Sequence, residues 1–404
     1  MKIYIYRRLF LLLCCACSVI ATAQTNHAQH TTNKIELGTS SAVDAQGRWW
    51  VASKAARGGD KNSDTIVLEM STDAGQTWSM PTPIDTINEA IAADGESRPK
   101  IAFGSKGELF IAYNKPLAKP YTGDIRFVRS LDGGVHFSTP VTVHANRDLI
   151  THRFESMILD ASGRIYIAWI DKRDAEAARA RKEKYAGAAI YYAVSDDAGA
   201  SFKGDFKLAE HSCECCRIAL ALNPAGMPVA MWRHVFAPNV RDHGMATLSA
   251  DGVAQPMTRV TFDDWRIDAC PHHGPALAFA DDGTRHQTWF NVKGEQGGVF
   301  YAAASPDGVL GKPIRLGSAQ AEHADVMVQG RQIILVWKQF NGTATSIFSR
   351  ASLDGGASWQ EREIASTKGH SDQPHLLRTS TGIALQWRTL HEGLRLKLIE
   401  SEKW

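Results

Sequence analysis

The sequence has no large excess of charge of either sign. It contains 45 lysine and arginine residues and 43 aspartate and glutamate residues. Lys2, Arg7 and Arg8 precede an apolar stretch near the start, so the rest of the chain has 42 basic and 43 acidic residues. A near-neutral chain of this kind gives no electrostatic basis for binding nucleic acid or an anionic membrane. We therefore expect neither as a partner.

Long hydrophobic runs are also scarce. The run Leu9–Ala21 is shorter than the roughly 20 apolar residues that span a bilayer. The basic residues before it and the small residues of Ala21-Thr22-Ala23 after it are typical of a secretory signal peptide. We expect a cleaved signal peptide over 1–23, a disordered lead-in over 24–33, a single domain over 34–404 and a periplasmic location. A short membrane anchor and a lipoprotein are the alternatives.

A long helical period is missing as well. The only helix-like insertion is Asp174–Tyr185, and elsewhere short apolar strands meet at tight polar turns. Seven such hairpins can be counted, each followed by a strand that ends in an aromatic residue. The hairpins are Asp44–Gly47, Gly104–Gly107, Asp160–Gly163, Asn223–Gly226, Asp281–Gly283, Gln329–Gly330 and Thr379–Gly382. The pattern predicts an all-β fold of four-stranded antiparallel blades, with seven blades preferred to six.

A second family of turns lies half a repeat away from the first. Its pattern is Ser-x-Asp-x-Gly-x-x-aromatic, in which Asp accepts hydrogen bonds from backbone amides and Gly takes a positive φ. Clear copies begin at Ser71, Ser130, Ser195 and Ser352, and weaker ones at Ser249 and Ser305. A repeat of this length needs neighbouring copies to form a core. The last unit shows three strands, so we expect the segment Lys34–Leu37 to supply its fourth and close the ring.

These turns resemble the Asp-boxes of the sialidase-like β-propeller family, and the resemblance covers nearly all of the chain after the leading segment. It implies a β-propeller and, as an activity, exo-α-sialidase. That family holds the substrate carboxylate with three arginines and uses a tyrosine nucleophile paired with a glutamate. The candidate arginines here are Arg98, Arg153, Arg217, Arg266 and Arg388. No tyrosine matches the nucleophile, because Tyr301 lies on a predicted strand away from the connections between strands.

Strand order within a blade predicts where reactive side chains gather. Both families of turns lie on one face of a propeller, so the connections from one blade to the next lie on the other face. Those connections carry a charge, an imidazole or a thiol in six places. We expect them to converge on the mouth of the central channel, which could accept a glycan or another small molecule. The candidate catalytic residues at this mouth are Arg98, Arg153, Glu155, Asp171 and Arg217.

Cysteine is rare after the leading segment. Four of the seven cysteines remain there, all in two consecutive connections, as Cys213-x-Cys215-Cys216 and Cys270-Pro-His272-His273. Thiolates and imidazoles are ligands for copper or zinc. The predicted metal ligands are Cys213, Cys215, Cys216, Cys270, His272, His273, His323 and His375. Disulfides that staple the two blades, or a redox-active thiol, are the alternatives, and neither a zinc-finger spacing nor a haem attachment motif occurs.

The sequence therefore leaves three functional hypotheses. The first is an exported propeller that binds a transition metal, plausibly copper, at the Cys/His cluster for metal handling or redox chemistry. The second is a sialidase or related glycoside hydrolase that acts at the same mouth. The third is a ligand-binding scaffold with structural disulfides. The sequence gives no clear signal for an oligomeric state.

Overall fold

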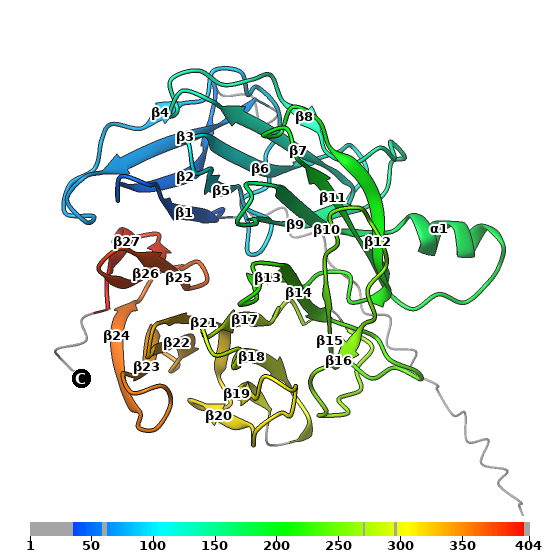
Figure 1. Ribbon diagram of the computed structural model, residues 1–404, viewed down its shortest axis with the longest axis vertical. Coiled ribbons are helices and arrows are strands. Elements are labelled where there is room, and N and C mark those ends of the chain that lie inside the picture. Colours follow the sequence, from blue (N-terminus) through cyan, green and yellow to red (C-terminus); the bar gives the residue numbers. More distant parts are fainter. Residues whose placement is uncertain (1–34, 59–62, 270, 295–296, 400–404) are drawn as a thin grey trace, which may run out of the picture. The chain divides into compact units, whose positions relative to one another are not determined.

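The computed structural model describes residues 35–58, 63–269, 271–294 and 297–399. These residues form seven antiparallel sheets that follow one another around a ring, so the chain is a seven-bladed β-propeller (Figure 1). The prediction of seven blades rather than six is confirmed. The predicted signal peptide and lead-in lie outside the described residues. No helix in the described part of the chain has the length and apolar character needed to cross a membrane.

Each blade takes consecutive strands of the chain, paired in sequence order from the ring centre outwards. The first three blades consist of β1 (Thr39–Val43), β2 (Trp49–Ala56), β3 (Asp64–Ser71) and β4 (Thr82–Pro83); β5 (Lys100–Phe103), β6 (Leu109–Pro116), β7 (Gly123–Ser130) and β8 (Val141–Thr142); and β9 (His152–Leu159), β10 (Ile165–Asp171), β11 (Ala188–Ser195) and β12 (Lys203–Ser212).

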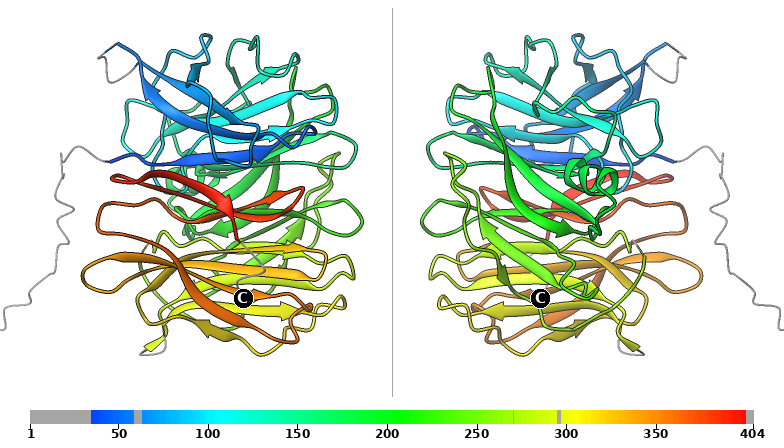
Figure 2. Two further views of the ribbon diagram at one scale, coloured as in Figure 1. Left: turned by 90° about the vertical axis from the view of Figure 1, so that its left-hand side faces the viewer. Right: turned by 90° about the vertical axis from the view of Figure 1, so that its right-hand side faces the viewer.

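The remaining blades repeat this arrangement. They consist of β13 (Ala219–Leu222), β14 (Pro228–Arg233), β15 (His243–Thr247) and β16 (Thr258–Arg259); β17 (Ala276–Phe279), β18 (Arg285–Asn291), β19 (Gly298–Ala304) and β20 (Ile314–Leu316); β21 (Ala321–Gln329), β22 (Gln332–Phe340), β23 (Thr345–Ser352) and β24 (Gln360–Thr367); and β25 (His375–Thr379), β26 (Gly382–Thr389) and β27 (Gly393–Leu398). The helix α1 (Arg173–Ala180) follows β10 and packs beside β11, outside the ring (Figure 2).

The core consists of apolar seams between neighbouring blades. The second strand of every blade places a large aromatic side chain in these seams. The sequence predicted an aromatic residue at the end of the strand that follows each hairpin. These residues are Trp50, Tyr113, Trp169, Trp232, Trp289, Trp337 and Trp387, and all of them are buried. Because each seam uses side chains from two blades, no blade can bury its apolar surface alone.

The seventh blade departs from the prediction, because it has three strands among the described residues. Ile35–Leu37 forms no strand, and Lys34 lies outside the described residues. The segment instead contacts the first blade and the connection that follows it. Glu36 forms an ion pair of 2.5 Å with Lys54 on β2, and the amide of Gly38, just after the segment, donates to the carbonyl of Ala93. The ring is instead closed by β1, which lies beside β25 and β26.

Candidate functional site

A cavity of about 250 Å³ lies where the innermost strands of all seven blades meet. Its charged and titratable lining residues come from four different blades. They are Glu96, Arg98, Lys100, Arg217, Asp325 and His375. Five of them belong to the connections between blades or to the beginnings of the innermost strands, and Asp325 lies in the middle of β21. Of the six predicted connections, four supply a charged or titratable side chain to this cavity, whereas those before β9 and β17 supply none among the residues that the structure describes.

The approach to β5 supplies three of these side chains at alternate positions. Glu96 lies in a tight turn closed by the amide of Ser97, which donates to the carbonyl of Asp94 over 3.0 Å, and Lys100 begins β5. The ammonium of Lys100 donates to the carbonyl oxygen of Glu96 over 3.1 Å. Glu96 Oε1 lies 3.7 Å from Arg217 Nη1, whereas Glu96 Oε2 is buried without a hydrogen-bond partner. Burial alone would raise the pKa of Glu96, but nearby positive charge, above all Arg217, holds it below its usual value.

The partly buried Lys100 and the buried Glu155 form an electrostatically coupled acid–base pair between the second and third blades. Burial lowers the pKa of Lys100 to about 8, although the charge of Glu155 opposes that shift. Burial likewise raises the pKa of Glu155 to about 7, with Lys100 opposing it. Glu155 is 1% exposed, and both of its carboxylate oxygens lack a hydrogen-bond partner. The pair can therefore take up or release a proton near neutral pH, which few groups in a folded protein can do.

Asp325 and His375 occupy the opposite side of the cavity. Asp325 Oδ2 accepts a hydrogen bond of 2.9 Å from the amide of Leu376 and lies 3.7 Å from His375 Nδ1. Burial lowers the pKa of His375, so its imidazole is neutral. His375 Nε2 is buried and has no hydrogen-bond partner. Two residues that line the cavity thus each hold one buried polar atom without a hydrogen-bond partner, His375 Nε2 and Glu96 Oε2.

The candidate arginines do not form a fork around a shared carboxylate position. Arg98 is 1% exposed and donates to both carboxylate oxygens of Asp372, over 2.6 and 2.7 Å. Arg217 donates to the carbonyls of Pro275 and Ala324 and turns only Nη1 towards Glu96. The guanidinium of Arg153 lies over the ring of Phe154, 4.9 Å from its centre, and Arg153 does not line the cavity.

Asp171 lies at the end of β10 rather than in the cavity. It is fully buried, and its carboxylate accepts hydrogen bonds from Trp169 over 2.9 Å and from Arg173 over 2.7 Å. These bonds occupy the oxygens that general acid catalysis would need. Tyr301 is also engaged away from the mouth, because its hydroxyl lies 2.8 Å from His286 Nδ1 inside the fifth blade. The sialidase pair of tyrosine and glutamate is therefore not assembled among the described residues.

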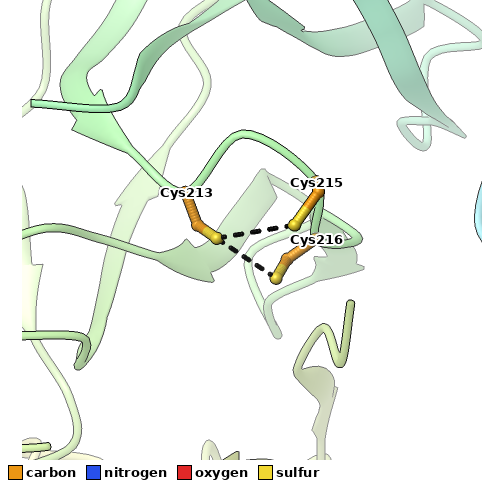
Figure 3. Close-up of side chains that lie close together, drawn as sticks. All are labelled: Cys213, Cys215 and Cys216. Carbon is orange, nitrogen blue, oxygen red and sulfur yellow. Dashed lines mark hydrogen bonds between the residues drawn. The ribbon is translucent and has the colours of Figure 1, made fainter. Parts of the chain in front are cut away.

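The predicted metal ligands divide into separate groups. Cys213, Cys215 and Cys216 meet between the third and fourth blades, where their sulfurs point towards one another (Figure 3). Cys270 lies outside the described residues. His272 takes a left-handed φ of 57°, and His375 belongs to the cavity.

His273 and His323 form the second group, together with Glu322. Their rings are 4.3 Å apart, and one ligand atom from each of the three residues lies within 4.8 Å of the others. Burial lowers the pKa of His273 to about 3 and that of His323 well below its usual value, so both imidazoles are neutral. Lys338, however, forms an ion pair of 3.1 Å with Glu322 and competes for the carboxylate.

A third cluster, Asp124, His144 and His152, is structural. The amide of Ile125 donates to His144 Nε2 over 3.1 Å, so that nitrogen has no lone pair left for a metal. His144 Nδ1 must then carry the proton, which it donates to the carbonyl of Asn146 over 2.6 Å. The stacked rings of the two histidines, 3.9 Å apart, fill the seam between the second and third blades.

Sequence reasoning did not single out Lys100 or give Glu96 and Asp325 a role. Lys100 is the first residue of β5, and its spacing of two from Arg98 was the available signal. Nothing in the sequence shows that Glu155 lies beside Lys100, because the two residues belong to different blades and meet only in the folded ring.

No family model matches the sequence, and no curated protein matches it. Among solved structures, a PL25 ulvan lyase bound to a GlcA(1-4)Rha3S unit has a TM-score of 0.54 at 11% identity, covering 90% of this chain and 94% of that one. The polysaccharide lyase Uly1 has a TM-score of 0.54 at 10% identity, covering 90% of each chain. The NanB sialidase from Streptococcus pneumoniae has a TM-score of 0.46 at 10% identity, covering 75% of this chain and 65% of that one. At these identities the likeness establishes the propeller fold and nothing finer.

Proposed function

We propose that this chain is an exported enzyme that cleaves glycosidic bonds in an acidic glycan, and that its reactive centre is the axial cavity. One observation carries the proposal. The cavity is lined by Glu96, whose pKa is lowered, and by Lys100, whose pKa is about 8 and which interacts with the adjoining Glu155, whose pKa is about 7. Groups whose environments push their pKa values apart in one site are typical of acid–base catalysis.

Each group has a role in this proposal. Lys100, which lines the cavity, exchanges a proton with the substrate, because its pKa is about 8. Glu155 lies behind it and interacts with it electrostatically. Glu96 provides a fixed negative charge with one unsatisfied oxygen, suited to orienting a sugar hydroxyl or stabilising developing positive charge. Arg217 Nη1 and the Lys100 ammonium face the cavity and orient the carboxylate of an acidic sugar. The ulvan lyase with a similar fold is bound to a unit that contains GlcA, which supports an acidic glycan as the substrate class.

A panel of uronate-containing and sialylated glycans tests the proposal. Hydrolysis would release new reducing ends alone, whereas β-elimination would also produce an unsaturated uronate that absorbs in the ultraviolet; either product supports bond cleavage. We expect Glu96→Gln and Lys100→Met to lower kcat by at least about 100-fold. Glu363→Gln, on the outer strand β24, is the matched control and should retain activity. No cleavage of any glycan, together with no shift of the melting temperature by the same glycans, would overturn the proposal.

A further inference from the structure

The three sulfurs of Cys213, Cys215 and Cys216 have the spacing of a metal-binding thiolate set. Cys213 Sγ lies 3.9 Å from Cys215 Sγ and 3.5 Å from Cys216 Sγ (Figure 3). A disulfide requires about 2.05 Å, so neither pair is bonded. Sulfurs that share a tetrahedral ion at a metal–sulfur distance of about 2.3 Å are about 3.8 Å apart. The observed separations lie on either side of that value.

Local backbone structure fixes this spacing. β12 ends at Ser212, which forms an isolated bridge with His234, and the amide of Cys213 donates to the carbonyl of Arg233 over 2.8 Å. The chain then turns back within three residues, so that Cys215 and Cys216 face Cys213. A backbone hydrogen bond from Cys213, the first of the three cysteines, therefore anchors the cluster to the end of β14 in the fourth blade.

The surroundings of the sulfurs favour a soft ion. Phe154, Ile190, Ile218 and Trp232 belong to the same buried cluster as the three cysteines. No aspartate or glutamate oxygen joins the set of ligand atoms among the described residues. Thiolates without oxygen ligands select Cu(I) or Zn(II) over Mg²⁺, Ca²⁺ or Mn²⁺. The His273–Glu322–His323 group is a weaker candidate, because Lys338 already holds its carboxylate.

Two arginines supply the positive charge that buried thiolates need. Arg233 is 1% exposed, and its guanidinium is fixed by hydrogen bonds of 2.8 Å to the carbonyls of His273 and Phe290. Hydrogen bonding to Cys213 and burial raise the pKa of the Cys216 thiol, and the charge of Arg233 opposes that shift. Arg153 interacts electrostatically with Cys215. Three thiolates and one Cu(I) carry a net charge of −2, which these two arginines balance. With Zn(II) the net charge is −1. The Cu(I) complex therefore leaves no uncompensated charge in the apolar wall, whereas the Zn(II) complex leaves one excess positive charge.

We propose that Cys213, Cys215 and Cys216 bind a thiophilic d¹⁰ metal ion, Cu(I) or Zn(II), in the wall between the third and fourth blades. This site is separate from the axial cavity and does not depend on the proposed glycan cleavage. Coordination requires loss of the thiol protons to solvent and no change in the oxidation state of the cysteines.

Metal binding by the reduced, purified chain under anaerobic conditions tests the proposal. One arm titrates Cu(I) against bicinchoninate, and the other titrates Zn(II) against a pyridylazoresorcinol indicator. We expect one ion per chain in at least one arm, and Co(II) should give sulfur-to-cobalt charge-transfer bands. Cys215→Ser and Cys216→Ser should each weaken binding by more than about 100-fold, since even residues that only support a ligand change affinity 10–100-fold. Ser358→Ala, in a turn of the sixth blade, should bind as the unchanged chain does.

A second measurement covers the case in which a cysteine variant fails to fold. The bound ion should protect all three thiols of the unchanged chain from iodoacetamide, as read by mass spectrometry of the peptides. Binding no stronger than that of the serine variants, or alkylation at equal rates with and without metal, would overturn the proposal. Disulfides among these cysteines in the isolated protein, with no metal uptake after reduction, would overturn it in favour of a stapling or redox role.

Discussion

The Lys100–Glu155 pair shows how burial creates reactivity from two ordinary side chains. Removing a carboxyl and an ammonium group from water disfavours both charged forms, so the pKa values of the two groups move towards each other. They reach about 7 for Glu155 and about 8 for Lys100. A proton can then move between them, or to a bound ligand, at a small cost in free energy near neutral pH.

The first prediction concerns the pKa of Lys100. In Glu155→Gln the negative charge that raises this pKa is lost while burial remains, so the pKa should fall below about 8. Competitive labelling of amines over a range of pH, with mass spectrometry of the Lys100 peptide, measures the pKa without requiring enzyme activity. Glu363→Gln should leave the labelling midpoint unchanged. An unchanged or higher midpoint in Glu155→Gln would show that the two groups do not interact.

A second prediction concerns the buried ion pair of Arg98 and Asp372. Asp372→Asn leaves the Arg98 guanidinium, 1% exposed, without a compensating charge. We expect a loss of about 3–5 kcal/mol in the free energy of unfolding, measured by urea denaturation. The double variant Arg98→Met/Asp372→Leu should recover part of that loss, because it removes both charges. A loss in Asp372→Asn as small as that of the exposed Arg181→Gln would contradict the prediction.

Individual contacts in the site could be predicted from the sequence only in part. Arg98 and Arg217 were placed at the mouth because strand order alone decides which connections share a face. The partner of Arg98 could not be predicted, since Asp372 is 274 residues away in the chain. Whether an arginine is available to a ligand depends on such partners, and therefore on the folded ring.

The Ser-x-Asp turns are the elements that the sequence specifies most completely. In the first blade, the amide of Gly75 donates to Ser71 Oγ over 2.8 Å, and Ser71 Oγ donates to Asp73 Oδ1 over 2.7 Å. The same bonds recur in the second, third and sixth blades. Each turn is closed by its own residues, so a local pattern is enough to predict it. The fourth strand of the seventh blade has no such local signal, and there the expectation failed.

A third prediction concerns the acid stability that these turns provide. Hydrogen bonds, above all from Thr77, lower the pKa of Asp73 to about 2, and the pKa of Asp197 is also about 2 because its hydrogen bonds outweigh burial. In the unfolded chain an aspartate has a pKa of about 3.9. The turns therefore stabilise the fold above about pH 4, and this contribution is lost as the pH falls towards about 2.

Melting temperatures measured between neutral pH and pH 2 test this prediction. Asp197→Asn should lower the melting temperature at pH 7 and have a smaller effect at pH 2, because the unchanged carboxylate is itself being protonated there. Asp281→Asn, in an exposed hairpin of the fifth blade, should show no such dependence. An equal loss in Asp197→Asn at both pH values would mean that the charged form contributes nothing.

At the scale of the whole molecule, the ring is closed by an apolar seam and by polar side chains rather than by a shared sheet. Gln386 on β26 donates to the carbonyl of Thr39 over 2.6 Å and accepts a hydrogen bond of 2.5 Å from the hydroxyl of Ser41. Gly75 lies against the last strand, and a Cβ there would be 2.5 Å from the carbonyl oxygen of Leu396. Its φ of 85° also favours glycine. The first and last blades therefore approach closely without strand exchange.

A fourth prediction concerns this closure. Gln386→Met keeps the side-chain length but removes both hydrogen bonds, so we expect a loss of about 2 kcal/mol in the free energy of unfolding. Amide hydrogen exchange should accelerate selectively in peptides from β1 and β27. Gln287→Met is the matched control, because Gln287 donates in the same way to Val260 across the seam between the fourth and fifth blades. If Gln386→Met accelerates exchange equally at the seam between the first and seventh blades and at the seam between the fourth and fifth blades, Gln386 does not stabilise the ring closure selectively.

Arg217 has a consequence for how the ring responds to a ligand. It enters from the fourth blade, is anchored by carbonyls at Pro275 in the fifth and Ala324 in the sixth, and faces Glu96 of the second. An anion that draws this guanidinium towards the axis would pull on its anchors in two neighbouring blades at once. Ligand binding in the axial cavity and the hydrogen bonds of Arg217 to the fifth and sixth blades are thus coupled through one side chain. The sector from Pro275 to Ala324 would therefore report on ligand binding even though most of it never touches the ligand.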